Sequence, residues 1–315
     1  MKNPVLKMSN QLFSRLISNK LFTQLTWLRF IGFEFWMVGF TPFFIGYVVG
    51  AGELFGVDLF YGFVIIAFLI SSTFILNHIC DLELDKKNPR KEFSLLVRGV
   101  ISVRNTWYFF WFLQISCLLM SIRFNTEFFY CIVGLTVISF VYNVEPFRFK
   151  TKPGFDLASN GLSLGFLIPL SAWSINQSIF DFPRLYFFAI FCYLLALYCP
   201  TMAVDVKFDR NSGIETFATL FGAVNTMRLS WIFTILGACS LLFSGFYEIF
   251  PWNYKLLIWT GWLLILEIVV HYIFLPINSQ PSYHTVAKGS IILATLEAVA
   301  TFFFLVIFLD IFSIG

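Results

Sequence analysis

Apolar residues are grouped along the chain into long stretches, and short segments between them hold most of the charged and turn-forming residues. A helix needs about 20 mostly apolar residues to cross roughly 30 Å of bilayer hydrocarbon. Nine stretches approach or exceed this length: Trp27–Gly50, Phe60–Cys80, Trp107–Ile122, Phe128–Tyr142, Leu157–Ile175, Tyr186–Ala203, Leu229–Phe246, Leu256–Leu275 and Ile291–Phe312. The pattern predicts an all-α integral membrane protein with about nine transmembrane helices in one bundle.

Composition agrees with this fold class. Hydrophobic residues make up 58% of the 315 residues and charged residues only 12%, against about 25% charged residues in an ordinary soluble domain. Residues 1–26 mix polar and apolar side chains without a cleavage-site pattern, so we expect an interfacial, cytoplasmic N-terminal segment there. Residues 27–315 contain no linker or low-complexity tract and are predicted to form a single transmembrane domain.

Basic residues predict the orientation of the helices. Cytoplasmic loops of membrane proteins collect Lys and Arg. With the N-terminus in the cytoplasm, 18 of the 21 basic residues fall on that side, which leaves Arg123, Arg184 and Lys255 for the other. The net charge of +3 is explained by this asymmetry, so it predicts no nucleic-acid partner.

The second stretch ends in the polar sequence NHICDLELD. Asn77, Asp81 and Asp85 are four residues apart, so on a helix each advances only about 40° and all three share one stripe. Glu83 points roughly the other way.

A second acidic pair ends the sixth stretch. Asp205 and Asp209 in AVDVKFDRNSG repeat the four-residue spacing. In the predicted topology both clusters lie at cytoplasmic ends of helices.

Carboxylates at this depth point to a metal. Ionisable residues near the membrane interior are costly and usually face a cavity, and four like charges repel one another unless a cation lies between them. Oxygen ligands suit Mg²⁺, whose shell substrate phosphates commonly complete. The predicted ligands are Asn77, Asp81, Asp85, Asp205 and Asp209. The alternative is a set of solvated interfacial charges beside Lys86, Lys87 or Arg210.

A bound diphosphate also needs fixed positive charge. Arg98, Arg148 and Lys150 lie in loops that follow the second and fourth stretches, and Arg can bind phosphate oxygens in a bidentate manner. The alternative role for each is topological anchoring.

These residues resemble the UbiA superfamily of intramembrane prenyltransferases. The first aspartate-rich motif of that family, N/D-x-x-x-D-x-x-x-D, matches Asn77, Asp81 and Asp85, and the second, D-x-x-x-D, matches Asp205 and Asp209. The sequence LVRG matches the family at Arg98 and Gly99. The segment YNVEPFRFKTKPGFDLASNG matches at Tyr142, Arg148, Lys150, Asp156 and Asn160.

The resemblance implies that two Mg²⁺ ions held by the catalytic aspartates bind the diphosphate of an isoprenyl donor. Tyr142 would stabilise the allylic cation through its π face, or else serve as an interfacial belt residue. Asp156 and Asn160 would line the substrate site, although Asp156 follows Pro-Gly and could instead cap a helix. The implied partners are the donor, a lipophilic acceptor and membrane lipid, with the active site toward the cytoplasm.

The acceptor stays open between two classes. RFKTKPGFDLASNG looks most like the branch that elongates carotenoids such as lycopene, but Glu145 and Pro146 depart from its pattern. An aromatic acceptor, as in quinone biosynthesis, is the alternative. More distant alternatives are an ion-coupled transporter, which would place acidic residues in mid-span, and an inactive scaffold.

Overall fold

The computed structural model describes residues 26–51, 55–88, 91–92 and 94–249, together with scattered positions between 258 and 292. This described part is helical and contains no strand, which confirms the all-α prediction. The eighth predicted span is described only in part, and the ninth lies almost wholly outside the described residues. The number of spans and the cytoplasmic N-terminus therefore stay predictions.

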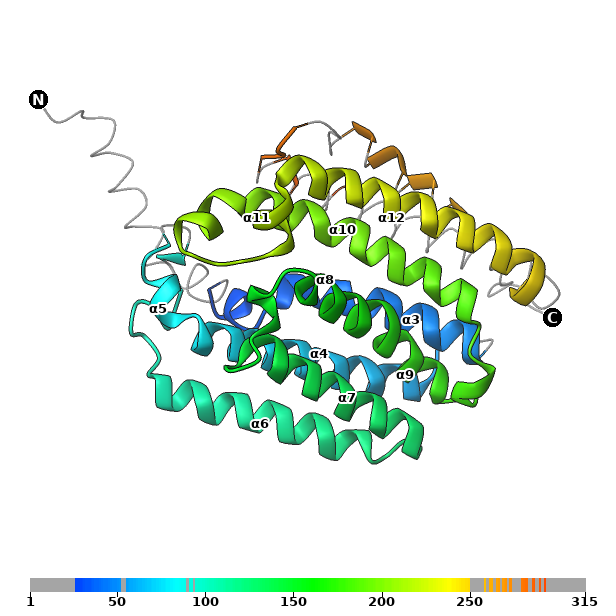
Figure 1. The fold of residues 1–315 in the computed structure, drawn as a ribbon. Coiled ribbons are helices and arrows are strands. Elements are labelled where there is room, and N and C mark those ends of the chain that lie inside the picture. The colour runs from blue at the N-terminus through cyan, green and yellow to red at the C-terminus, as the bar shows by residue number, and fades with distance from the viewer. Residues whose placement is uncertain are drawn as a thin grey trace, which may run out of the picture. The chain divides into compact units, whose positions relative to one another are not determined.

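Figure 1 shows the order of the helices. The α-helices are α3 (Trp36–Ala51), α4 (Val57–Cys80), α5 (Leu82–Asp85), α6 (Val103–Ser121), α7 (Thr126–Asn143), α8 (Phe155–Asn160), α9 (Ile168–Ser174), α10 (Arg184–Asn211), α11 (Phe217–Phe221) and α12 (Ala223–Ser244). Short 3₁₀ segments are η1 (Phe33–Phe35), η3 (Phe149–Thr151) and η5 (Ile179–Asp181), and π segments are η4 (Gly161–Leu167) and η6 (Gly245–Ile249). Among the described helices, α4, α7, α10 and α12 are long and apolar enough to cross a membrane.

The fifth predicted span is three segments rather than one regular helix. It begins as α8, widens into the π-helical η4, and continues as α9. Pro169 stands in the first turn of α9 and has no N–H to donate to the preceding turn, which favours a change of helical geometry at this point. Gly165 of η4 lies so close to α10 that an added Cβ would be 2.5 Å from the Cα of Phe191.

The helices divide into two compact units. One consists of Met1–Phe40 and Phe63–Met120, and the other of Thr41–Gly62 and Ser121–Gly315. The first aspartate motif belongs to the first unit and the second motif to the second unit. The predicted single domain stays a prediction.

In the first unit, buried polar side chains join α4 to α6. The Ser72 hydroxyl donates to Gln114 Oε1 at 2.9 Å, and the Cys117 thiol donates to the Ile65 carbonyl at 3.5 Å. Interhelical hydrogen bonds of this kind support packing where lipid is as apolar as the helix surface. These hydrogen bonds hold α4, the helix that leads into the first motif, against α6.

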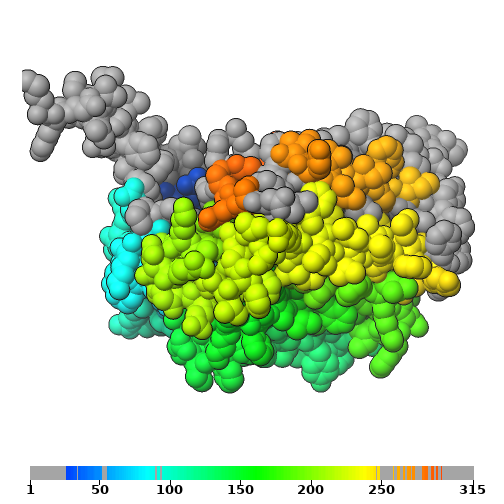
Figure 2. All heavy atoms as spheres, turned by 45° about the horizontal axis from the view of Figure 1, so that its top comes forward, coloured from blue at the N-terminus to red at the C-terminus, as the bar shows by residue number. Residues whose placement is uncertain are grey.

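The second unit is organised around α10. Its main apolar cluster draws on α3, α7, α9, α10 and α12, with Ile45, Cys131, Trp173, Tyr186 and Leu241 among its members. A further cluster joins α8, α10 and α11 through Leu157, Leu195, Cys199, Met202, Val206 and Ala218. Side chains of α11 and α12 lie next to each other on the face shown in Figure 2. The part of α10 that carries the second motif is thus held by neighbours within its own unit.

A close backbone contact joins α3 to α9. A Cβ added to Gly46 would lie 2.3 Å from the carbonyl oxygen of Pro169, whereas a Cβ on Gly134 of α7 would meet only Leu167 Cδ1, at 3.4 Å. Small residues such as Gly allow the backbones of two helices to pack closely in membranes.

We expect Gly46→Ala to lower the free energy of unfolding by about 1–3 kcal/mol, because the backbone atoms it meets cannot rotate away. Gly134→Ala is the matched control and should leave stability unchanged or raise it by up to about 1 kcal/mol, because Ala favours a helix over Gly. Thermal unfolding in detergent measures both. Equal melting temperatures for the two variants would contradict the close contact.

Candidate functional site

The first motif follows a helical path across the junction of α4 and α5. Asp81 lies between these helices with φ −98° and ψ 4°. Its N–H donates to the Asn77 carbonyl at 2.9 Å, and the Asp85 N–H donates to the Asp81 carbonyl at 2.7 Å. Because the four-residue hydrogen bonds continue through the junction, the backbone keeps the spacing that predicts a common stripe.

The three side chains of the stripe are more buried than the neighbouring Glu83. Asp85 is only 8% exposed, and Asn77 and Asp81 are half-buried. Glu83 is exposed and pairs with Lys86, 2.7 Å from its Oε1, and this cation lowers the pKa of the Glu83 carboxyl. Glu83 is therefore outside the stripe, as its spacing predicts.

A histidine that the spacing gave no role lies beside this motif. The His78 ring is buried and stacks on Phe30, with ring centroids 5.2 Å apart. Its Nδ1 is 3.8 Å from Asp85 Oδ2, which is too long for a hydrogen bond. Arg98, the basic residue predicted to act with this motif, is exposed in the following loop. Its backbone N–H donates to the Ser94 carbonyl at 3.0 Å.

The second motif lies on one continuous helix. Asp205 and Asp209 are in the last two turns of α10, and both are half-buried. The helix extends to Asn211, beyond the apolar stretch that predicts the sixth span.

Neighbouring segments support the backbone of α10 above this pair. Pro200 lies inside the helix and has no N–H, so the Ala196 carbonyl cannot receive its usual helical hydrogen bond. The Ser230 hydroxyl of α12 donates to this carbonyl at 2.6 Å. The Gln280 side-chain amide donates to the Ala203 carbonyl at 3.0 Å. These two hydrogen bonds connect α10 to other segments within the ten residues that precede Asp205.

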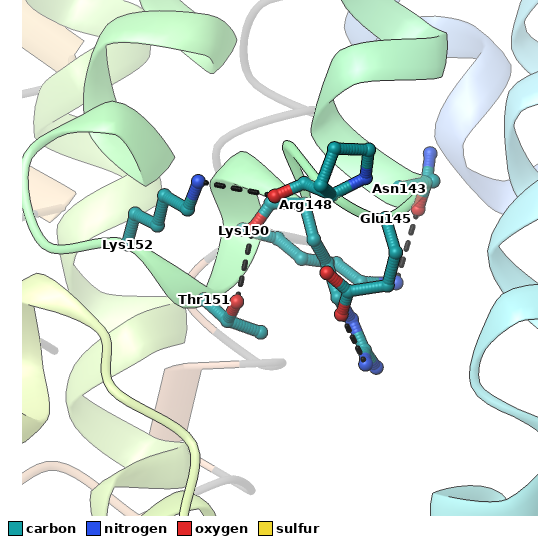
Figure 3. A network of polar contacts seen from close by, with 7 residues as sticks. Asn143, Glu145, Arg148, Lys150, Thr151 and Lys152 are labelled. Carbon is teal, nitrogen blue, oxygen red and sulfur yellow. Dashed lines mark hydrogen bonds and ion pairs between the residues drawn. The ribbon is translucent and has the colours of Figure 1, made fainter.

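The basic loop that follows α7 is attached to the end of that helix (Figure 3). Lys150 Nζ donates to Asn143 Oδ1 at 3.1 Å, and Asn143 is 1% exposed. The Asn143 amide in turn donates to the Ser139 carbonyl at 3.0 Å. The ammonium group of Lys150 is thus held at the end of α7 by a buried side chain.

Arg148 is held by a residue that departs from the carotenoid-branch pattern. Its Nη1 is 3.3 Å from Glu145 Oε1, and its backbone is left-handed, with φ 38°. The Thr151 hydroxyl donates to the Arg148 carbonyl at 2.9 Å, and Lys152 Nζ donates to the Pro146 carbonyl at 3.2 Å. Glu145 therefore orients the guanidinium group across the loop in Figure 3.

Both carboxylate oxygens of Asp156 accept hydrogen bonds from backbone N–H groups. Its Oδ1 accepts from the N–H groups of Gly154 and Leu157, at 2.8 and 2.9 Å, and its Oδ2 accepts from Phe217 N–H at 2.8 Å. The Asn160 amide donates to the Asp156 carbonyl at 2.9 Å. Asp156 is the second residue of α8, whose N-cap is Gly154, so it is not the N-cap residue that the alternative predicted; its carboxylate also holds the first residue of α11. Substrate lining by Asp156 and Asn160 stays a prediction.

Tyr142 lies in the last turn of α7, and its hydroxyl is 3.1 Å from that of Tyr198 on α10. Sequence reasoning did not include Tyr198 in the site. The available signal was its spacing, because it lies seven residues before Asp205 on the same side of a helix.

Both motifs supply the donor chemistry that Mg²⁺ prefers, because their side chains offer only carboxylate and amide oxygens. Among the described residues, no group of three or more His, Cys, Asp or Glu side chains is arranged to hold a metal ion. A shared site of Asn77, Asp81, Asp85, Asp205 and Asp209 therefore stays a prediction.

Comparison with known proteins identifies relatives. The model of the UbiA prenyltransferase family matches residues 39–283. The lycopene elongase/hydratase of Halobacterium salinarum is 26% identical over 203 residues, which cover 60% of this chain and 69% of that protein. A 4-hydroxybenzoate octaprenyltransferase of Francisella tularensis subsp. novicida is 27% identical over 175 residues, which cover 55% of this chain and 59% of that protein.

The fold has a solved counterpart. The structure of a UbiA homolog from Archaeoglobus fulgidus bound to GPP and Mg²⁺ aligns with a TM-score of 0.73 and 20% identity, and covers 88% of this chain and 98% of that one. At this identity the likeness establishes the fold.

The contacts of Asp156 predict a structural effect when it is changed. Asp156→Asn replaces an acceptor oxygen by an NH₂ group and should lower the free energy of unfolding by about 2 kcal/mol, because a buried hydrogen bond to a charged group is lost. Asp181→Asn, at an exposed position, is the control. Thermal unfolding in detergent measures the difference. Wild-type stability together with weaker binding of geranyl diphosphate would instead favour the substrate-lining role.

Proposed function

This chain belongs to the UbiA prenyltransferase family, and we propose that it is a Mg²⁺-dependent intramembrane enzyme that transfers an isoprenyl group from an allylic diphosphate to a lipophilic acceptor. The observation that carries the proposal is the presence of both aspartate motifs at helix ends, with four-residue spacing preserved in each. A solved structure with this fold supports the donor, because that homolog was bound to GPP and Mg²⁺.

The chain's own residues divide into two groups in this reaction. Asn77, Asp81, Asp85, Asp205 and Asp209 would hold the metal. A metal held by these residues would supply positive charge against the departing diphosphate. Arg98, Arg148 and Lys150 would contact the phosphate oxygens, and Arg148 and Lys150 are already oriented by Glu145 and Asn143.

The reaction replaces one carbon–oxygen bond by one carbon–carbon bond. The allylic carbon–oxygen bond breaks, and both of its electrons leave with pyrophosphate. The allylic carbon then forms a bond with an electron-rich carbon of the acceptor, which afterwards loses a proton to the released pyrophosphate or to water. Tyr142 would face the positive charge that develops on the allylic carbon. The active site would open toward the cytoplasm, because the basic loops lie on that side in the predicted topology.

For the acceptor we propose a carotenoid or terpenoid such as lycopene. The lycopene elongase/hydratase relative and the RFKTKPGFDLASNG segment support it. An aromatic acceptor is the second candidate, because a 4-hydroxybenzoate octaprenyltransferase is similar to the same degree. The match to the UbiA prenyltransferase family favours a prenyltransferase over the transporter alternative.

Removal of a predicted metal ligand tests the reaction. We expect Asp81→Ala and Asp205→Ala each to lower Mg²⁺-dependent pyrophosphate release from geranyl diphosphate by about 100-fold or more, since stabilisation of the leaving group is lost. Glu83→Gln, which changes an exposed carboxylate next to the first motif, should keep wild-type activity. Wild-type turnover by Asp205→Ala at saturating Mg²⁺ would exclude the metal assignment.

The acceptor is tested by product mass spectrometry. Purified protein in detergent receives Mg²⁺, a labelled C5 or C20 allylic diphosphate and a panel of lycopene, 4-hydroxybenzoate and dihydroxynaphthoate. We expect lycopene to gain the isoprenyl mass. A gain on an aromatic acid would move the protein to quinone biosynthesis, and no consumption of any donor would favour the inactive scaffold.

A further inference from the structure

The hydrogen bond between Tyr142 and Tyr198 joins the end of α7 to the middle of α10. The two hydroxyl oxygens are 3.1 Å apart, so one hydroxyl donates and the other accepts. Both tyrosines are half-buried and belong to the second compact unit. Each tyrosine thus orients the other across two helices that are far apart in the sequence.

The position of Tyr198 on α10 relates it to the second motif. It precedes Asp205 by seven residues and Asp209 by eleven. At 3.6 residues per turn, these spacings place all three residues within about 40° of one another around the helix. Along the helix axis, Tyr198 is about 10 Å from Asp205, toward the start of α10. An isoprenyl chain that runs from a diphosphate at Asp205 and Asp209 toward the start of α10 would pass Tyr198.

The surroundings of Tyr198 are largely apolar, with Tyr142 and the Asp156 carboxyl as the polar groups that act on its hydroxyl. The ring packs against the cluster that contains Leu195, Cys199 and Met202. A phenol hydroxyl in such surroundings needs a hydrogen-bond partner, and Tyr142 provides it.

Tyr142 also connects to the basic loop. The next residue, Asn143, holds Lys150 at 3.1 Å. The last turn of α7 therefore carries the aromatic ring and, through Asn143, the position of a cation. A rotation of this turn would move both.

We propose that Tyr198 is a positioning residue, whose hydroxyl fixes the ring of Tyr142 against the allylic end of the isoprenyl donor. This inference rests on the proposed function. The ring of Tyr142, held by this hydrogen bond, then presents its π face to the carbon that becomes positively charged when pyrophosphate leaves. Tyr198 then affects the chemical step and leaves diphosphate binding to the aspartates and basic residues.

A double-mutant cycle tests the proposal. We expect Tyr198→Phe to lower kcat about tenfold, the effect of one neutral hydrogen bond, with the KM for geranyl diphosphate unchanged. Tyr142→Phe removes the same bond and should have the same effect, and the double variant should be no slower than either single variant. Tyr193→Phe is the control, since its ring lies against Gly237 of α12 and should not affect kcat.

A binding measurement separates positioning from other roles. Geranyl diphosphate with Mg²⁺ should raise the melting temperature of Tyr198→Phe by the same amount as that of the wild type. Additive losses in the double variant, an unchanged kcat in Tyr198→Phe, or a weakened donor affinity would each overturn the proposal. Failure of the proposed function has a different signature, because the wild type would then consume no allylic diphosphate.

Discussion

The constraint on which this structure depends is that the hydrocarbon of a bilayer offers no water to backbone polar groups, so each must find a partner within the protein. The long helices meet this requirement through their own hydrogen bonds, and the irregular points meet it through side chains. Where Pro200 interrupts the ladder of α10, Ser230 supplies a donor to the Ala196 carbonyl. Where the chain turns before α8, the buried carboxylate of Asp156 accepts three backbone N–H groups. Both irregular points lie in the second unit, and Pro200 precedes Asp205 by five residues on α10.

Electrostatics explains why the polar residues of the site recur as connected groups. A charge near the membrane interior is expensive unless another group compensates it. The structure compensates Arg148 with Glu145 and holds Lys150 with the buried Asn143. The same requirement applies to the carboxylates of the two motifs, for which a hard divalent cation is the natural counter-charge.

The second compact unit holds part of the proposed site with few polar residues. The end of α7 carries Tyr142 and Asn143, and α10 carries Tyr198, Asp205 and Asp209. The apolar cluster around Cys199 and Met202 fixes α10 against α8 and α11. Rigid helices therefore determine the direction of each side chain, and the loop between α7 and α8 supplies the cations.

The sequence alone determined the fold class and the chemistry. The length of its apolar stretches requires helices, and the four-residue spacing of Asn77, Asp81 and Asp85 fixes a common stripe, because both follow from the local periodicity of a helix. The family resemblance followed from the same motifs, and the family match confirmed it. Only the tertiary structure decided the partners of Asp156, Glu145 and Tyr142. Spacing along one helix carries no information about a donor 61 residues away, such as the N–H of Phe217, because side-chain packing and loop geometry bring such groups together.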